Sequence, residues 1–132
     1  MIINSTVHFE SNTIILVDAL SVDDLNTCLR LFDDLLPLSI KHVSPAVEYY
    51  KITSRKEFME LLDRVKNRCV LGLKPIIHIE AHGNQADGIV INGNRSEIVS
   101  WQESIDLFRN INVVAQNNLG VVMATCFGIL VE

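Results

Sequence analysis

The stretch PIIHIEAHG, residues 75–83, decides the fold of this chain. It begins with a continuous apolar run after a proline, a pattern typical of a strand that is covered on both faces of a parallel sheet. It ends in ionisable chemistry, because two histidines and a glutamate precede the final glycine. In α/β sheets, binding and catalytic groups collect where strands end at their carboxyl edge. The stretch therefore predicts the third main strand of such a sheet and a candidate functional site at its end.

Three further strands and a hairpin are predicted around this stretch. Apolar or β-branched runs cover residues 13–17, 46–52 and 119–128, and we expect the first and the last of them to be buried. Directly after the central strand, the sequence ADGIVINGNRSEIVS predicts a β-hairpin, with strands at Ile89–Ile91 and Glu97–Val99 and a turn at NGN.

Three segments carry apolar residues at helical spacing. The first is expected to begin with Ser21 as its N-cap and to stop at Pro37. The second and third begin at capping boxes, Ser54–Glu57 and Ser100–Glu103. Their inner faces are predicted to be Val22, Leu25, Leu29, Phe32 and Leu36 in the first, Phe58, Leu61, Leu62, Val65 and Cys69 in the second, and Ile105 and Phe108 in the third.

Strands that alternate with helices imply right-handed βαβ units. We therefore expect a three-layer α/β fold: a mainly parallel sheet with helices on both faces and a β-hairpin insertion after the third main strand. With 48% hydrophobic and 20% charged residues, residues 1–132 have the composition of a single globular domain.

Composition and charge argue against several functions. A net charge of −5 does not favour binding to nucleic acid or to an anionic membrane. No apolar run reaches the roughly 18 residues of a membrane span, and the first ten residues do not resemble a secretory signal. The three cysteines form no short pairing motif, which favours a reducing, cytoplasmic location. Cys28 and Cys69 lie on or beside apolar helical stripes and are expected in the core.

A histidine and a cysteine follow two of the predicted strands. His82 ends the third main strand and Cys126 ends the fourth, so neighbouring strands would bring both to the same edge. A nearby imidazole can take the proton of a thiol and make it a nucleophile. Gly83 follows the histidine, and its amide, together with that of Cys126, could stabilise a developing oxyanion. These residues predict a catalytic dyad with an oxyanion hole.

At this point the sequence resembles a known family. PIIHIEAHG followed by VVMATCFG is similar to the caspase-like cysteine peptidases, including their bacterial relatives of the CHAT type, and the hairpin resembles the segment that joins the two motifs. The resemblance covers residues 14–128 and is specific mainly from Pro75 onwards. It implies a caspase-like fold, His82 as acid/base partner and Cys126 as nucleophile, and peptide-bond hydrolysis in a protein substrate through a thioester, without a cofactor. Ala124 and Thr125 replace the caspase signature before the cysteine, so aspartate specificity is not implied.

The resemblance also implies a partner. Relatives continue past the nucleophile with at least two more strands and helices, which supply much of the substrate pocket, whereas this sequence ends at Glu132. We therefore expect the domain to be incomplete at its C-terminus and to associate with a C-terminal segment or with a second copy of itself, as in a homodimer, because an exposed apolar sheet edge invites pairing.

Other residues and other functions remain open from the sequence. Glu80 could orient His82, and Asp18 could contact substrate or cap the turn after its strand. The sequence HIE also fits the His-x-Glu of zinc deaminases, but the pair of cysteines that completes that metal site is missing, and no metal site is predicted. The principal alternative to a peptidase is a non-catalytic or latent caspase-like module with an assembly or regulatory role.

Overall fold

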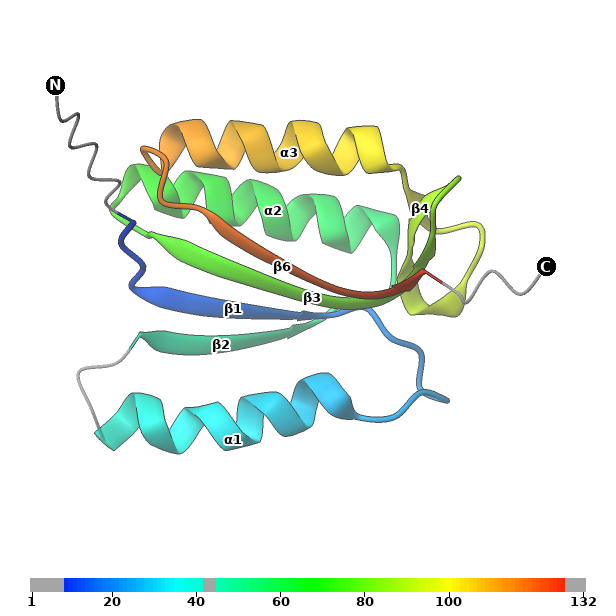
Figure 1. Ribbon diagram of the computed structural model, residues 1–132, viewed down its shortest axis with the longest axis horizontal. Coiled ribbons are helices and arrows are strands. Elements are labelled where there is room, and N and C mark those ends of the chain that lie inside the picture. The colour runs from blue at the N-terminus through cyan, green and yellow to red at the C-terminus, as the bar shows by residue number, and fades with distance from the viewer. Residues whose placement is uncertain (1–8, 42–44, 128–132) are drawn as a thin grey trace, which may run out of the picture.

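The computed structural model describes residues 9–41 and 45–127, which form three α-helices and a six-stranded mixed sheet (Figure 1). The strands are β1 (Thr13–Asp18), β2 (Ala46–Lys51), β3 (Pro75–Asn84), β4 (Gly88–Val90), β5 (Ile98–Val99) and β6 (Gly120–Phe127). The helices are α1 (Thr27–Lys41), α2 (Arg55–Val70) and α3 (Trp101–Val114), and the short 3-10 turn η1 (Ile91–Gly93) joins β4 to β5. The predicted α/β class is confirmed. No helix in these ranges is long and apolar enough to cross a membrane.

β3 is the central strand of the sheet. Its first half pairs in parallel with β1, and β1 pairs in parallel with β2. Ile76 has partners in both β1 and β6, whereas His82 has partners in both β4 and β6. β6 therefore occupies one edge of β3, while β1 and then the antiparallel β4 share the other. The hairpin takes over the edge of β3 where β1 ends.

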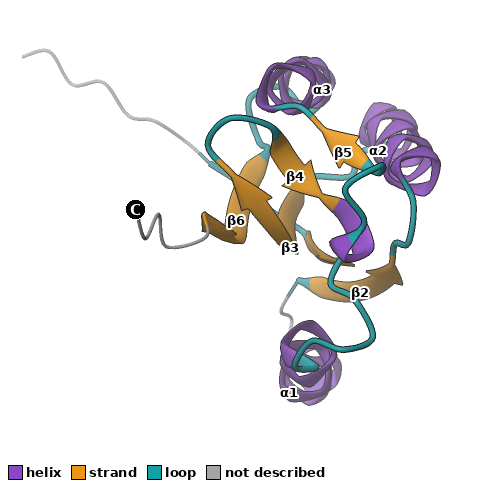
Figure 2. Cartoon of the chain, turned by 90° about the vertical axis from the view of Figure 1, so that its right-hand side faces the viewer, coloured by secondary structure: helices purple, strands orange, loops and turns teal. Residues whose placement is uncertain are grey.

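The helices lie in two layers, one on each face of the sheet (Figures 1 and 2). α2 and α3 cover the face that carries the odd-numbered residues of β3, including the fully buried Ile77 and Ile79. Ser54 caps α2 by accepting from the Glu57 amide, as predicted, and all five residues of its predicted inner face are buried. α1 packs on the opposite face, against β1 and β2. The predicted arrangement of helices on both faces is confirmed.

The first helix, α1, begins and ends at other residues than the sequence predicted. Ser21 does not cap it: the Asp24 carboxylate accepts from the Ser21 amide and the Asp24 amide donates to the Ser21 carbonyl, which folds these residues into a turn. α1 begins only at Thr27, so Val22 and Leu25 are exposed rather than on its inner face. The helix also continues through Pro37, since a proline removes only one backbone donor and can be accommodated inside a helix at a cost.

Two other expectations about burial are corrected. β6 reads as a buried strand, but Val121 and Val122 are exposed, and no strand within residues 9–41 and 45–127 pairs with the outer edge of β6. Ile105 was expected on the inner face of α3 and is exposed as well, whereas Ser104 and Ile111 are the buried positions of that helix. The hairpin is found where predicted, except that Ile91 belongs to η1 and Glu97 precedes β5, so that neither lies in a strand.

Candidate active site

β3 and β6 bring the two predicted dyad residues to directly opposite positions. In the parallel ladder between these strands, His82 is the register partner of Cys126, and Gly83 is the partner of Phe127. Residues in register on neighbouring parallel strands lie on the same face of a sheet. Positions 82 and 126 are therefore neighbours on one face, near the carboxyl ends of both strands. The sequence also predicts a tight turn at Gly128, two residues after Cys126, and this residue lies outside the described ranges.

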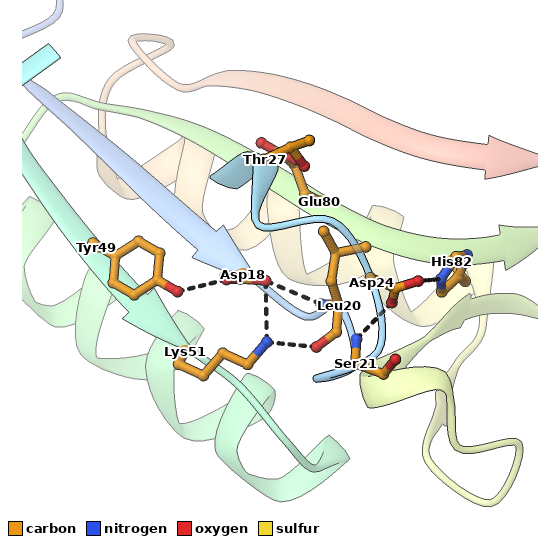
Figure 3. Close-up of polar contacts among 9 residues, drawn as sticks. All are labelled: Asp18, Leu20, Ser21, Asp24, Thr27, Tyr49, Lys51, Glu80 and His82. Atoms are coloured by element: carbon orange, nitrogen blue, oxygen red, sulfur yellow. Dashed lines mark hydrogen bonds and ion pairs between the residues drawn. The ribbon is translucent and has the colours of Figure 1, made fainter. Parts of the chain in front are cut away.

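The His82 imidazole is exposed to solvent and held by a carboxylate (Figure 3). Its Nε2 lies 2.8 Å from Oδ1 of Asp24, in the turn between β1 and α1. The other carboxylate oxygen of Asp24 accepts from the Ser21 amide at 2.7 Å. The hydrogen bond with His82 is the main reason that the pKa of Asp24 lies below its ordinary value of 3.8. Asp24 is therefore ionised at neutral pH and fixes the orientation of the imidazole.

Asp24 was missed by sequence reasoning, which offered Glu80 for this role. The two Glu80 carboxylate oxygens have other partners: one accepts from the Thr27 hydroxyl at the start of α1, and the other lies 2.9 Å from Nε2 of His78. Glu80 is buried beneath α1. The suggestion that Glu80 orients His82 is therefore wrong for this structure, and the separation of 58 residues between His82 and Asp24 explains why no local pattern indicated their contact.

Asp18 has a structural role at the end of β1. Its carboxylate accepts from the Tyr49 hydroxyl, from the Leu20 amide at 3.2 Å and from Lys51 Nζ at 3.3 Å (Figure 3). The contact with Leu20 is the turn cap predicted from the sequence. Asp18 is only 2% exposed, so it offers no surface to a substrate. The burial of Tyr49, together with its hydrogen bond to the Asp18 carboxylate, raises the pKa of the Tyr49 hydroxyl.

The two cysteines expected in the core are buried there. Burial, with further contributions from the charges of Glu80 and Asp18, raises the pKa of Cys28 to about 12. Burial also raises the pKa of Cys69. Both thiols are therefore protonated at neutral pH, and neither is a candidate nucleophile, since the thiolate is the reactive form.

Gly83 is required by the hairpin rather than by a turn. It lies inside β3, and a Cβ atom placed on it would approach the Gly88 carbonyl oxygen to 2.8 Å. Gly83 therefore allows β4 to approach β3 closely. The direction of the Gly83 amide can be inferred from Glu80, whose carbonyl oxygen accepts from the Ala19 amide on the β1 side. Backbone groups of successive strand residues point to alternate edges. The even-numbered residues of β3 therefore direct their backbone groups toward β1 and β4, and the odd-numbered residues toward β6. The Gly83 amide thus faces the strand that carries Cys126.

A groove of about 460 Å³ extends from His82 along the end of the sheet. It is lined by Ser21, by His82, Gly83 and Asn84 of β3, and by Val90, Arg95 and Ile98 of the hairpin. The Trp101 indole donates to the Asn84 carbonyl at 2.7 Å and ties the end of β3 to α3. The groove leaves the imidazole of His82 open to solvent.

Comparison with known proteins gives no relative: no protein-family model and no curated protein matches the chain.

Proposed function

We propose that this chain is the catalytic portion of a caspase-like cysteine peptidase, with Cys126 as nucleophile and His82 as acid/base partner. The observation that carries the proposal is the register of β3 and β6, in which Cys126 is the partner of His82, a residue that lines the groove. The order of elements, with a hairpin between the histidine strand and α3, is compatible with a caspase-like fold. The resemblance of PIIHIEAHG and VVMATCFG to that family supports the same assignment.

The position of Asp24 determines which nitrogen of His82 reacts. An ionised carboxylate beside Nε2 favours the tautomer with its proton on Nε2, which leaves Nδ1 with a free lone pair. Nδ1 would accept the proton of the Cys126 thiol, and the thiolate would attack the carbonyl carbon of the scissile peptide bond. The imidazolium would then protonate the leaving amine as the C–N bond breaks, and water would hydrolyse the resulting thioester.

The proposed oxyanion hole involves the amides of Gly83 and Cys126. The Gly83 amide faces β6 at the last rung of the ladder, where Gly83 pairs with Phe127. Binding of a substrate oxyanion would therefore require this last rung to open. In this proposal the Gly83 amide becomes available as a donor only after the last rung between β3 and β6 opens. Such a requirement is consistent with a peptidase that must be activated before it cleaves substrate.

A thiol-labelling experiment tests the proposal. Iodoacetamide at neutral pH should alkylate Cys126 selectively over the buried Cys28 and Cys69, as read by peptide mass spectrometry. His82→Ala should lower the alkylation rate of Cys126 at least about tenfold, because the base that removes the thiol proton is lost. His78→Ala, on the same strand, is the matched control and should leave the rate within about twofold.

The alternative is a latent assembly or regulatory module. It is favoured by the pairing of Gly83 within the ladder, which leaves the oxyanion site closed. In that case Cys126 would be alkylated no faster in the parent chain than in His82→Ala. That result would contradict the peptidase proposal and support the module.

A further inference from the structure

The loop between β1 and α1, residues 19–26, carries Asp24 and is not held by apolar packing at that point. Val22 and Leu25, on either side of Asp24, are 89% and 82% exposed. A segment with few buried apolar contacts is among the first parts of a fold to move. Because the Asp24 carboxylate must stay at its 2.8 Å distance from Nε2 of His82 to orient the imidazole, polar contacts have to hold this loop.

Glu80 of β3 holds both ends of this loop. Its backbone carbonyl accepts from the Ala19 amide at 2.8 Å, where the loop begins. Its carboxylate accepts from the hydroxyl of Thr27, the first residue of α1, where the loop ends (Figure 3). Glu80 and His82 lie on the same face of β3, so the loop is fastened to one strand at both ends and, through Asp24, in its middle.

The start of the loop has further anchors. The Ala19 carbonyl accepts from the Asn92 amide at 2.7 Å, and the Leu20 amide donates to the Asp18 carboxylate at 3.2 Å. The other end, where α1 begins, is the end nearer to the carboxylate that faces the imidazole. Loss of the Thr27 hydroxyl should therefore release the part of the loop that matters for the orientation of the imidazole.

The acceptor of the Thr27 hydroxyl is itself fixed. Glu80 is 8% exposed, and its second carboxylate oxygen lies 2.9 Å from Nε2 of His78. Hydrogen bonds to a carboxylate are stronger than those between neutral groups. Thr27 therefore donates to an acceptor that is held in place from its other side, which makes the contact a suitable anchor.

We propose that Thr27 is a positioning residue for His82: its hydroxyl anchors the end of the β1–α1 loop to Glu80 and so holds the Asp24 carboxylate against the imidazole. Thr27 is not among the residues that line the groove, and it acts on the imidazole through Asp24. The consequence for the reactivity of Cys126 rests on the proposed function, whereas the position of Asp24 does not.

The titration of Asp24 tests this position without any peptidase chemistry. In the parent chain the hydrogen bond with His82 is the main cause that lowers the pKa of Asp24 below 3.8. Thr27→Val removes the hydroxyl but keeps the shape of the side chain, and the carboxyl ¹³C midpoint of Asp24 should rise toward 3.8. Thr27→Ser keeps a hydroxyl and should retain the parent midpoint.

Thr53→Val is the matched control. The Thr53 hydroxyl also donates to a carboxylate beside the start of a helix, that of Glu57 in α2, at 2.6 Å. Thr53 does not line the groove, so the same change at this position should leave the Asp24 midpoint where it is.

Alkylation of Cys126 by iodoacetamide tests the route through Asp24. Thr27→Val should slow it about threefold, because the orienting carboxylate is displaced. Combined with Asp24→Asn, it should slow alkylation no further than Asp24→Asn alone, since a residue that acts through another adds nothing once the other is removed. A parent chain in which Cys126 is not alkylated selectively would contradict the proposed peptidase, while the Asp24 titration would still decide the role of Thr27.

The folding of each variant is checked by circular dichroism and thermal unfolding, and Thr27→Ala, which favours a helix, replaces Thr27→Val if that variant does not fold. An unchanged Asp24 midpoint in a folded variant that lacks the Thr27 hydroxyl would overturn the proposal and leave Thr27 a role in the stability of α1 alone. An equal rise in Thr53→Val would also overturn it, as would a double variant in which the two rate effects multiply.

Discussion

The same strand carries two histidine–carboxylate pairs that differ in their surroundings. In both, Nε2 of the imidazole faces a carboxylate oxygen, at 2.9 Å for His78–Glu80 and 2.8 Å for His82–Asp24. Both histidines are even-numbered residues of β3 and lie on the same face. The side chains of the first pair are 17% and 11% exposed, whereas those of the second are 46% and 24% exposed.

Two neighbours account for the difference. The first turn of α1 lies over Glu80 through Thr27, whereas the groove leaves His82 open. Their register partners on β6 differ too, since His78 is opposite Val122 and His82 is opposite Cys126. The same pair chemistry is therefore buried in one case and open to solvent in the other, and only the open pair lies opposite the proposed nucleophile. The predictions below test that separation.

The largest expected effect is on stability, from the buried pair. Glu80→Ala removes the partner of His78 and Thr27 beneath α1, and we predict that the free energy of unfolding falls by about 3 kcal/mol. Urea denaturation followed by circular dichroism measures it. Asp24→Ala, at the exposed pair, should cost less than about 1 kcal/mol. Equal losses from both variants would show that exposure does not separate the two pairs.

The next effect is on reactivity, from the exposed pair. Asp24→Asn keeps the shape of the side chain but loses the charge that orients His82, and we predict a roughly tenfold slower alkylation of Cys126 with an unchanged melting temperature. Asp23→Asn removes an equal charge from the same turn and serves as the control, with no change in rate expected. If both variants slow alkylation equally, the effect is one of general charge and not of orientation.

A smaller effect is expected in the titration of Asp24. Its lowered pKa means that the folded state is stabilised above the unfolded value, near 3.8, and that this contribution is lost as the pH falls through the lowered value. Carboxyl ¹³C NMR should therefore show Asp24 titrating below 3.8. In His82→Gln the midpoint should move back toward that value. A midpoint that stays where it was would assign the shift to the Ser21 amide instead.

The smallest change is expected at Cys28, which lies beside the buried carboxylates. With a pKa of about 12, its thiol should remain unalkylated at pH 8 in the folded chain and react only after unfolding in urea. Peptide mass spectrometry after timed labelling distinguishes these states. Reaction of Cys28 at the rate of Cys126 in the folded chain would show that α1 opens readily.

Local patterns predicted what local interactions determine. The Ser54 cap and five residues at helical spacing identified α2 and its buried face, because the capping signal and the periodicity agree there. The alternation of strands and helices predicted the adjacency of β3 and β6, and hence that of His82 and Cys126.

The errors arose where tertiary contacts override local patterns. Val22 and Leu25 continue the helical spacing of α1. However, the carboxylate of Asp24, which lies between them, is hydrogen-bonded to the Ser21 amide and to His82, and the segment forms a turn. An apolar strand such as β6 has the same sequence pattern whether a neighbouring strand covers it or not. The Asp24–His82 contact had no sequence signal, because it joins residues that only the folded sheet brings together.

One edge of β3 pairs with β1 along its first half and with β4 at its end, and only the end of β3 lines the groove. β1 pairs with Pro75–Glu80 of β3, whereas β4 of the hairpin pairs with His82–Asn84, and Arg95 and Ile98 of the hairpin line the groove. Changes in the length or composition of the hairpin tip could therefore reshape what the groove accepts without disturbing the β1–β3 pairing. If the groove binds substrate as proposed, the tip around Asn94–Ser96 is the place to alter specificity by loop grafting, with the β1–β3 pairing left as it is.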